Sequence, residues 1–126
     1  MSIIIIGAGP AGCEAAYRLA QSGEQVELIE KENETGGNLN NWYQLFPDRK
    51  SAKELNRLLR QNLNHPNIRV HLNCEPVKII RENNSFSIDL NDGAQLQGEA
   101  LLLTTGFRTF NARRKEEYGY GIYENV

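Results

Sequence analysis

The stretch "IIIIGAGPAGCEAA", residues 3–16, decides the fold of this chain. A run of β-branched residues leads straight into three glycines, Gly7, Gly9 and Gly12, which have the spacing G-x-G-x-x-G. A continuous apolar run without alternation is typical of a parallel strand that is covered on both faces. We therefore expect a central strand at residues 2–6 that ends in a tight glycine turn.

A helix is expected directly after this turn. Pro10 suits the first helical turn, where its missing N–H costs little, and small apolar residues follow at helical spacing up to Gly23. The run "QVELIE", residues 25–30, then predicts a second strand. Strand, helix and strand together make one βαβ unit, which is right-handed by default.

A second helix is expected at residues 51–63, with Ser51 and Glu54 spaced as a capping box. Its expected apolar stripe consists of Ala52, Leu55, Leu58, Leu59 and Leu63. Residues 68–72 then predict a third parallel strand.

The second half of the chain has a different pattern. Short alternating runs at about residues 75–99, separated by turn signals, predict a three-stranded antiparallel meander. An apolar run at residues 100–104 predicts a fourth parallel strand, and the polar tail, residues 107–126, predicts no regular element. The expected fold is therefore α/β: a single domain, residues 1–126, with a Rossmann-like parallel sheet and a three-stranded antiparallel β-meander crossover.

Composition narrows the range of partners. The 126 residues carry 14 basic and 16 acidic side chains with no long block of like charge, which argues against nucleic acid as a partner. The sequence has no signal-peptide core or apolar span, and its two cysteines lie far apart. We expect a cytoplasmic protein with no metal site, no nucleic acid and no membrane among its ligands.

The glycine spacing predicts a dinucleotide site. Gly7 makes the tight turn, Gly9 lets the backbone approach a pyrophosphate, and Gly12 lets the helix pack closely on the strand. The helix N-terminus favours an anion, and Glu30, 18 residues after Gly12, suits the hydroxyls of an adenosine ribose. The same carboxylate disfavours a 2′-phosphate, and the alternative is a structural turn beside an ordinary strand-end glutamate.

NAD and FAD share this fingerprint, and two features favour FAD. The pair Gly36-Gly37 follows Glu30 in "EKENETGG". The expected meander stands where an NAD domain commonly has a crossover helix, and the strand after it ends in "LLLTTGF". Both quoted segments resemble the extended signatures of flavoproteins with two dinucleotide-binding domains. The predicted cofactor-binding set comprises Gly7, Gly9, Pro10, Ala11, Gly12, Glu30, Lys31, Gly36, Gly37, Val77, Thr104, Thr105 and Gly106.

The remaining chemically active residues are interpreted as structural. Cys13 suits a small position packed beneath the phosphate loop, and Cys74 has no partner in the sequence pattern. For His65 and His71 a packing or capping role is favoured. Aromatic residues at positions 42, 43 and 46 could line a flavin or form an apolar lid. No side chain is predicted to be an acid–base catalyst.

A narrower resemblance lies in "HPNIRVHLNCEPVKI" and "GFRTFNARRKEEYGYGIYENV". These segments are similar to the flavin-binding core of the heterodisulfide reductases and their relatives. The resemblance implies electron transfer through a noncovalent FAD, with the chain near Val77 beside the adenine. That family commonly has cysteines after the double glycine and continues beyond the position of Val126. We therefore expect a truncated FAD-binding domain that depends on the rest of a flavoprotein or on an electron-transfer partner.

Two other functions remain open from the sequence. The chain could be a non-catalytic adenine-nucleotide-binding or interaction module that keeps only the adenosine pocket. It could also be a plain NAD-binding domain. The flavin, if bound, would supply the chemistry, so the expected function is the cofactor-holding part of an oxidoreductase.

Overall fold

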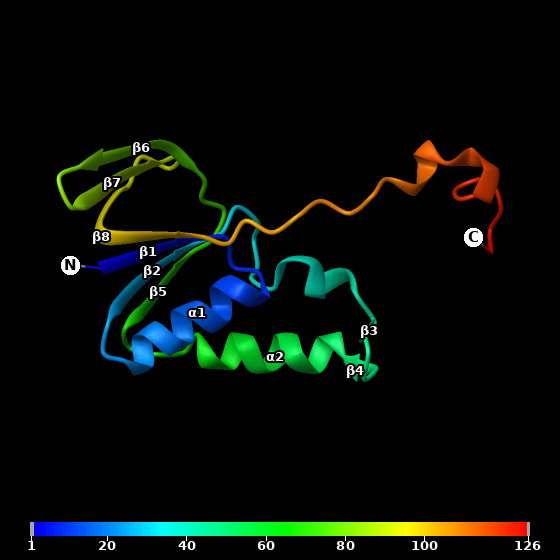
Figure 1. Ribbon diagram of the computed structural model, residues 1–126, viewed down its shortest axis with the longest axis horizontal. Coiled ribbons are helices and arrows are strands. Elements are labelled where there is room, and N and C mark those ends of the chain that lie inside the picture. Colours follow the sequence, from blue (N-terminus) through cyan, green and yellow to red (C-terminus); the bar gives the residue numbers. More distant parts are fainter. Residues whose placement is uncertain (1, 126) are drawn as a thin grey trace.

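A computed structural model describes residues 2–125 of the chain, so Met1 and Val126, the ends of the expected domain, lie outside it. One six-stranded sheet, in the order β5-β2-β1-β8-β7-β6, forms the centre of the molecule (Figure 1). Its strands are β1 (Ser2–Ile6), β2 (Gln25–Ile29), β5 (Ile68–His71), β6 (Pro76–Glu82), β7 (Ser85–Leu90) and β8 (Gln95–Leu103). The expected Rossmann-like α/β fold is confirmed.

The first βαβ unit forms as predicted. Strands β1 and β2 pair in parallel, joined by helix α1 (Pro10–Gln21), and β5 pairs in parallel with β2. Gly23 follows the end of α1 and has a φ of +93°. Glycine is suited to this position because it takes the left-handed conformation without steric cost. Helices α1 and α2 (Ala52–Asn62) lie together on one face of the parallel strands (Figure 1).

The prediction of a separate fourth parallel strand at residues 100–104 is wrong. Residues up to Leu103 continue the third meander strand, so the single strand β8 pairs antiparallel with β7 and then parallel with β1. The change of partner occurs at Gly98, which pairs with both Phe86 and Ser2. A Cβ at Gly98 would lie 2.6 Å from the Ser2 carbonyl oxygen, so this close crossing of strands requires glycine.

The core consists of two layers, one on each face of the sheet. Ile5, Val26 and Leu28 pack with α1 and α2 on the helical face. Ile4, Ile29 and Ile88 form the second cluster, where the meander curls over the opposite face (Figure 1). Burial on both faces explains why the run at residues 3–6 does not alternate.

Helix α2 begins directly after Ser51, its predicted N-cap, whose side chain accepts a hydrogen bond from the Glu54 N–H at 3.3 Å. Ala52, Leu59 and Leu63 are buried as predicted. Leu58 is 51% exposed, so its placement in the apolar stripe is wrong. Asn56 occupies a buried position on this helix instead.

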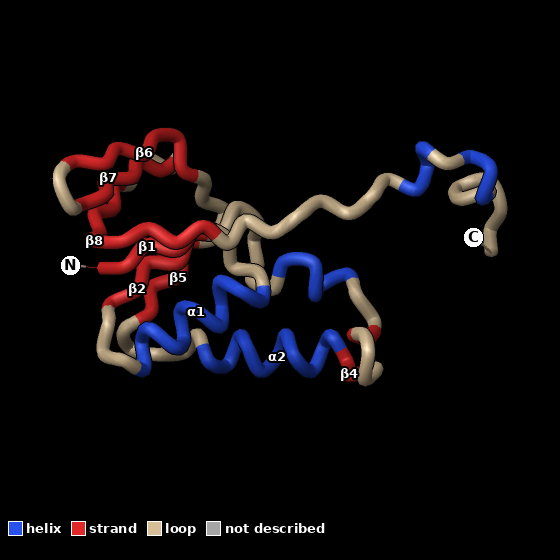
Figure 2. Tube along the Cα trace, viewed as in Figure 1, coloured by secondary structure: helices blue, strands red, loops and turns tan. Residues whose placement is uncertain are grey.

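Two irregular segments contain elements that the sequence does not predict. The polar loop after β2 includes a 3-10 helix at Gly37–Asn41 and a hairpin of β3 (Gln44–Leu45) and β4 (Lys50–Ser51). The tail contains 3-10 turns at Ala112–Arg114 and Glu116–Tyr118, which Figure 2 shows on an arm that extends away from the sheet. The prediction of no regular element there is therefore wrong.

Candidate dinucleotide-binding site

The ends of three parallel-paired strands meet at the predicted site. The Gly7 N–H donates to the Ile29 carbonyl at 2.8 Å, which ties the glycine turn to β2. The Thr104 hydroxyl, just past β8, donates to the Gly7 carbonyl at 2.8 Å. Residues 7, 30 and 104 thereby lie at one edge of the sheet, where α/β folds commonly bind their ligands.

The Glu30 carboxylate is hydrogen-bonded to the backbone of the glycine loop. Its Oε2 accepts a hydrogen bond from the Ala8 N–H at 2.8 Å, and its Oε1 accepts one from the Glu32 N–H at 3.0 Å. The residue is only 7% exposed. Each carboxylate oxygen has a second lone pair, so Glu30 can still accept hydrogen bonds from ligand hydroxyls.

The fingerprint glycines differ in the space around them. A Cβ at Gly7, where φ is +104°, would lie 2.4 Å from the Thr104 carbonyl oxygen, and one at Gly12 would lie 1.9 Å from the Gly7 carbonyl oxygen. At Gly9 nothing lies within 4 Å of the Cβ position. Gly7 and Gly12 are therefore required by the fold, whereas Gly9 leaves open space that a ligand can fill.

The N-terminus of α1 opens onto this space. Gly9 is the N-cap and provides no side-chain hydrogen bond, and Pro10 and Ala11, both exposed, form the first turn. Free amides at a helix start attract anions, and the macrodipole adds to this attraction. The arrangement suits a phosphate group next to Gly9.

The double-glycine loop folds back onto the same region. The Gly36 N–H donates to the Ala8 carbonyl at 2.7 Å, and a Cβ at Gly37 would lie 3.1 Å from the Gly9 Cα. Both glycines have positive φ, +116° and +54°. Residues distant in sequence thus form one glycine-rich surface over the N-terminus of α1.

The outer predicted residues lie around this surface. Lys31, Thr105 and Gly106 are exposed just beyond the strand ends. Val77 is 65% exposed near the start of β6, and the preceding Cys74 N–H donates to the Glu30 carbonyl at 3.0 Å. The backbone three residues before Val77 is therefore joined to the backbone of Glu30.

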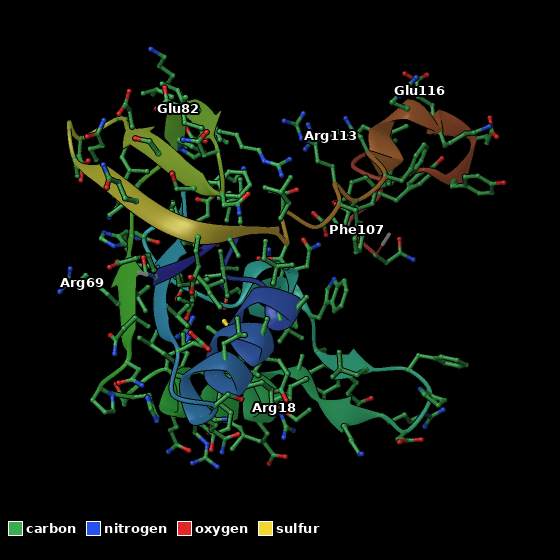
Figure 3. All side chains as sticks on the ribbon, turned by 60° about the vertical axis from the view of Figure 1, so that its left-hand side comes forward. Arg18, Arg69, Glu82, Phe107, Arg113 and Glu116 are labelled. Atoms are coloured by element: carbon green, nitrogen blue, oxygen red, sulfur yellow. The ribbon has the colours of Figure 1, made fainter. Side chains whose placement is uncertain are left out.

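Phe107 borders the site where the chain leaves the sheet. Its ring lies 6.4 Å from that of Trp42, centroid to centroid, and its carbonyl accepts a hydrogen bond from the Asn38 side chain at 3.4 Å. Figure 3 shows Phe107 at this exit point, whereas Arg113 and Glu116 lie farther along the extended arm. Tyr43 and Phe46 are 84% and 98% exposed, so neither is part of an apolar lid in this structure.

Cys13 lies beneath the glycine loop, where its thiol donates to the Ala8 carbonyl at 3.2 Å. Burial raises the pKa of the Cys13 thiol from 9.0 to about 11, and the Glu30 carboxylate adds to the increase. A protonated, buried thiol is inert at neutral pH, which agrees with a packing role. Burial and a hydrogen bond to Asp92 also raise the pKa of the Cys74 thiol.

Both histidines make local polar contacts. His65 Nδ1 accepts a hydrogen bond from the Asn67 N–H at 3.2 Å, as expected for a residue that caps a turn. His71 Nε2 lies 2.6 Å from Glu27 Oε2 on the neighbouring strand.

A polar cluster that sequence reasoning missed supports the double-glycine loop from α2. Arg60 Nη2 donates to the Thr35 carbonyl and to Glu34 Oε2, each at 2.8 Å, and the Asn56 amide donates to Asn40 Oδ1. The available signal was the polar Asn56 at a core-facing position of the helix, four residues after buried Ala52 and four before Arg60.

Two surface hollows follow α2 and share Ser51, Lys53, Asn56 and Arg60 in their linings. Neither of these two hollows is lined by Gly9 or Glu30. Within residues 2–125, no cluster of three or more His, Cys, Asp or Glu side chains is arranged to hold a metal ion. No helix in this part of the chain is both long and apolar enough to cross a membrane.

Comparison with known proteins agrees with this geometry. A family described as NAD(P)-binding Rossmann-like domain matches residues 5–68, which include the glycine turn, α1, Glu30 and all of α2. The chain belongs to this Rossmann-like family. The matched range covers half of the chain and contains the first βαβ unit from Ile5 in β1 onward.

Curated relatives of this Rossmann-like domain are much longer. The chain is 34% identical to a CoB-CoM heterodisulfide reductase component of Methanosarcina acetivorans over 69% of its own length and 11% of that protein. It is 29% identical to ferredoxin–NADP reductase of Lactococcus lactis, over 90% of its own length and 37% of that protein. It therefore spans well under half of either relative.

Among solved structures, thioredoxin reductase of Lactococcus lactis superposes with a TM-score of 0.76 at 24% sequence identity. The match covers 94% of this chain and 40% of that protein. This likeness shows that the fold extends over nearly the whole chain, including the meander.

Proposed function

We propose that the chain is the FAD-binding part of a flavoprotein oxidoreductase that transfers electrons, with the remainder of the site supplied by further sequence or by a partner protein. The observation that carries the proposal is the contact between the double-glycine loop and the phosphate loop. Gly37 lies against Gly9, and the Gly36 N–H binds the Ala8 carbonyl. This loop is one of the two features by which the sequence favours FAD over NAD.

The proposed ligand lies along the edge of the sheet. The adenine contacts the chain near Val77, the ribose hydroxyls donate to Glu30, and the pyrophosphate lies over Gly9 at the free first-turn amides of helix α1. The open space at Gly9 accommodates a phosphate, and Glu30 is buried between the two ends of this path. Lys31, Thr105 and Gly106 lie at the outer margin.

The bound flavin supplies the redox chemistry, and the residues of this chain bind and orient the ADP portion. Glu30 fixes the ribose, and its charge opposes a 2′-phosphate. No residue of the site is proposed as an acid–base catalyst. The relatives named as ferredoxin–NADP reductase and heterodisulfide reductase are both reductases by name, which supports the same class for this protein.

The finer assignment is to the heterodisulfide reductase type. The segments "HPNI" and "EYGYG" support it, and the relative from Methanosarcina is 34% identical over 88 residues. We propose a cytoplasmic setting and a redox protein as the partner. An NAD-binding domain and a non-catalytic adenine-nucleotide module are the competing functions.

Absorbance of the purified chain distinguishes these functions. A flavin spectrum, present on purification or after loading with FAD, is the expected result. A colourless protein that binds ADP but takes up no FAD would favour the nucleotide module, and preferential binding of NAD would favour the NAD domain. Equilibrium titration with FAD, NAD and ADP separates the three outcomes.

Replacing the ribose-binding carboxylate tests the ligand position. Glu30→Gln should weaken FAD and ADP binding by about 1–3 kcal/mol, because a charge-assisted hydrogen bond to the ribose is lost. Titration calorimetry measures the change, with the partly buried Glu24→Gln at the opposite end of β2 as the control. Equal affinities for Glu30→Gln and the unmodified chain would contradict the ribose assignment.

A further inference from the structure

The double-glycine loop is held in place by side chains of α2 as well as by its own backbone. Arg60 Nη2 contacts three acceptors on the loop: the Thr35 carbonyl at 2.8 Å, Glu34 Oε2 at 2.8 Å and Asn40 Oδ1 at 3.0 Å. These acceptors lie on both sides of the glycine pair. One guanidinium group therefore closes residues 34–40 into a compact turn.

Asn56 supports the same turn from beneath. It is 7% exposed, its amide donates to Asn40 Oδ1, and a Cβ at Gly36 would lie 2.4 Å from its Oδ1. The side-chain amide thus packs directly against the Gly36 Cα. Asn40 Oδ1 accepts from both Asn56 and Arg60, which joins the two α2 residues into one network.

This network has a cost for stability. Asn56 Oδ1 is buried and has no hydrogen-bond partner among the described residues. Such an oxygen is destabilising, and an apolar side chain at this core-facing position would avoid the loss. The apolar contacts of Ala52, Leu59 and Leu63 already hold α2 against the core. Stability alone therefore does not account for the asparagine.

The loop that the network holds is in contact with the phosphate loop. The Gly36 N–H binds the Ala8 carbonyl at 2.7 Å, and the Ala8 N–H binds Glu30. Gly37 approaches Gly9, where the open space lies. A displacement of residues 34–40 would therefore change the position of the backbone beside the expected pyrophosphate.

We propose that Arg60 and Asn56 are positioning residues that hold the Gly36-Gly37 loop against the phosphate loop before a pyrophosphate binds. The inference rests on the proposed function, because it assigns the pyrophosphate of a dinucleotide to Gly9. Neither side chain contacts the ligand in this scheme. They keep the loop ordered in the free protein. Binding then does not lose the conformational entropy that ordering a mobile loop would cost.

Titration of the full chain with ADP and AMP provides the first test. Arg60→Ala should weaken ADP binding by about tenfold, since ordering of the loop then opposes binding, and should weaken AMP binding much less. Arg60→Lys should recover part of the loss, because an ammonium group can still donate to the Thr35 carbonyl and Glu34. Arg57→Ala, on the exposed side of the same helix, is the matched control.

Amide hydrogen exchange without ligand provides the second readout. The Gly36 amide, which donates to Ala8, should exchange about tenfold faster in Arg60→Ala and in Asn56→Ala, whereas core amides of β1 should be unchanged. A general loss of stability would accelerate both sets. The comparison therefore separates a positioning role from a structural one.

The two measurements together support or overturn the positioning role of Arg60 and Asn56. Faster Gly36 exchange together with selective loss of ADP affinity supports the proposal. Unchanged ADP affinity, an equal loss of AMP affinity, or unchanged Gly36 exchange overturns it while the proposed function stands. If the unmodified chain binds neither FAD nor ADP, the proposed function fails first, and the positioning role fails with it.

Discussion

Gly9 and Gly12 occupy the same motif but are glycine for different reasons. Gly12 faces the Gly7 carbonyl oxygen at a distance that excludes a side chain, so the contact is internal to the fold. Gly9 faces open space, and its φ of −73° is accessible to any residue. The fold itself therefore leaves room for a side chain at position 9.

This difference leads to a paired prediction. Gly12→Ala should unfold the domain or lower its stability by about 3 kcal/mol or more, since a backbone oxygen blocks the new methyl group. Gly9→Ala should leave the free energy of unfolding within about 0.5 kcal/mol of the original and abolish tight ADP binding. Urea unfolding and titration calorimetry of the two variants provide the check. Normal ADP binding by Gly9→Ala would contradict the pyrophosphate position.

Cys13 gives the protein a specific dependence on alkaline pH. Because burial raises the pKa of its thiol from 9.0 to about 11, the folded state binds the proton more tightly than the unfolded state does. The associated stability is complete below pH 9 and is lost as the pH rises through 11. By pH 10.5 the loss should be about 2 kcal/mol.

Urea unfolding at pH 8 and pH 10.5 measures this effect. Lysine and tyrosine side chains also titrate in this range, so Cys13→Ala is the necessary comparison. The variant should lose less stability than the original chain between the two pH values. Equal losses would show that the thiol does not carry the effect.

At the scale of elements, the single strand β8 links the antiparallel meander to the parallel sheet. Its first residues pair with β7 in the meander, and its later residues pair with β1 in the parallel sheet. The strand therefore connects the antiparallel meander directly to the edge that holds the candidate site, where the Thr104 hydroxyl donates to the Gly7 carbonyl. Gly98 lies where the two pairings meet.

Substitution at this crossing should affect the whole sheet. Gly98→Ala should lower the free energy of unfolding by about 2 kcal/mol, because the new methyl group would lie 2.6 Å from the Ser2 carbonyl oxygen. Gln97→Ala, an exposed change on the adjacent residue, should have a much smaller effect. Chemical denaturation of both variants measures the difference, and equal stabilities would show that β8 can shift away from β1 at no cost.

At the scale of the whole molecule, the tail contributes little to the folded body. The hydrogen bonds that the structure gives to residues 109–125 stay within that segment, and Figure 1 shows it extending away from the sheet. Its aromatic side chains Phe110, Tyr118 and Tyr123 are largely exposed. The fold is therefore complete without this arm.

Removal of residues 109–126 should leave the melting temperature nearly unchanged, with the free energy of unfolding altered by less than about 0.5 kcal/mol. Phe107 remains and keeps its contact with Trp42, the single tryptophan, whose fluorescence should also be preserved. Thermal unfolding followed by circular dichroism gives the comparison. A clear drop in melting temperature would mean that the arm packs on the body in solution.

The sequence by itself determined the parallel sheet, both α-helices and the position of Glu30, because each depends on local periodicity or on spacing within one βαβ unit. The continuous β-branched run, the glycine spacing and the Ser51 cap are signals carried by neighbouring residues. The boundaries of most strands follow from the same signals to within a residue.

Only the tertiary structure decided how distant segments meet. It joined residues 100–103 to the meander in one strand, brought Gly37 against Gly9, and placed Arg60 and Asn56 beneath the double-glycine loop. These contacts depend on packing between segments far apart in sequence, and no local pattern encodes them. The glycine motif is thus a property of the sequence, whereas the glycine-rich surface around it is a property of the fold.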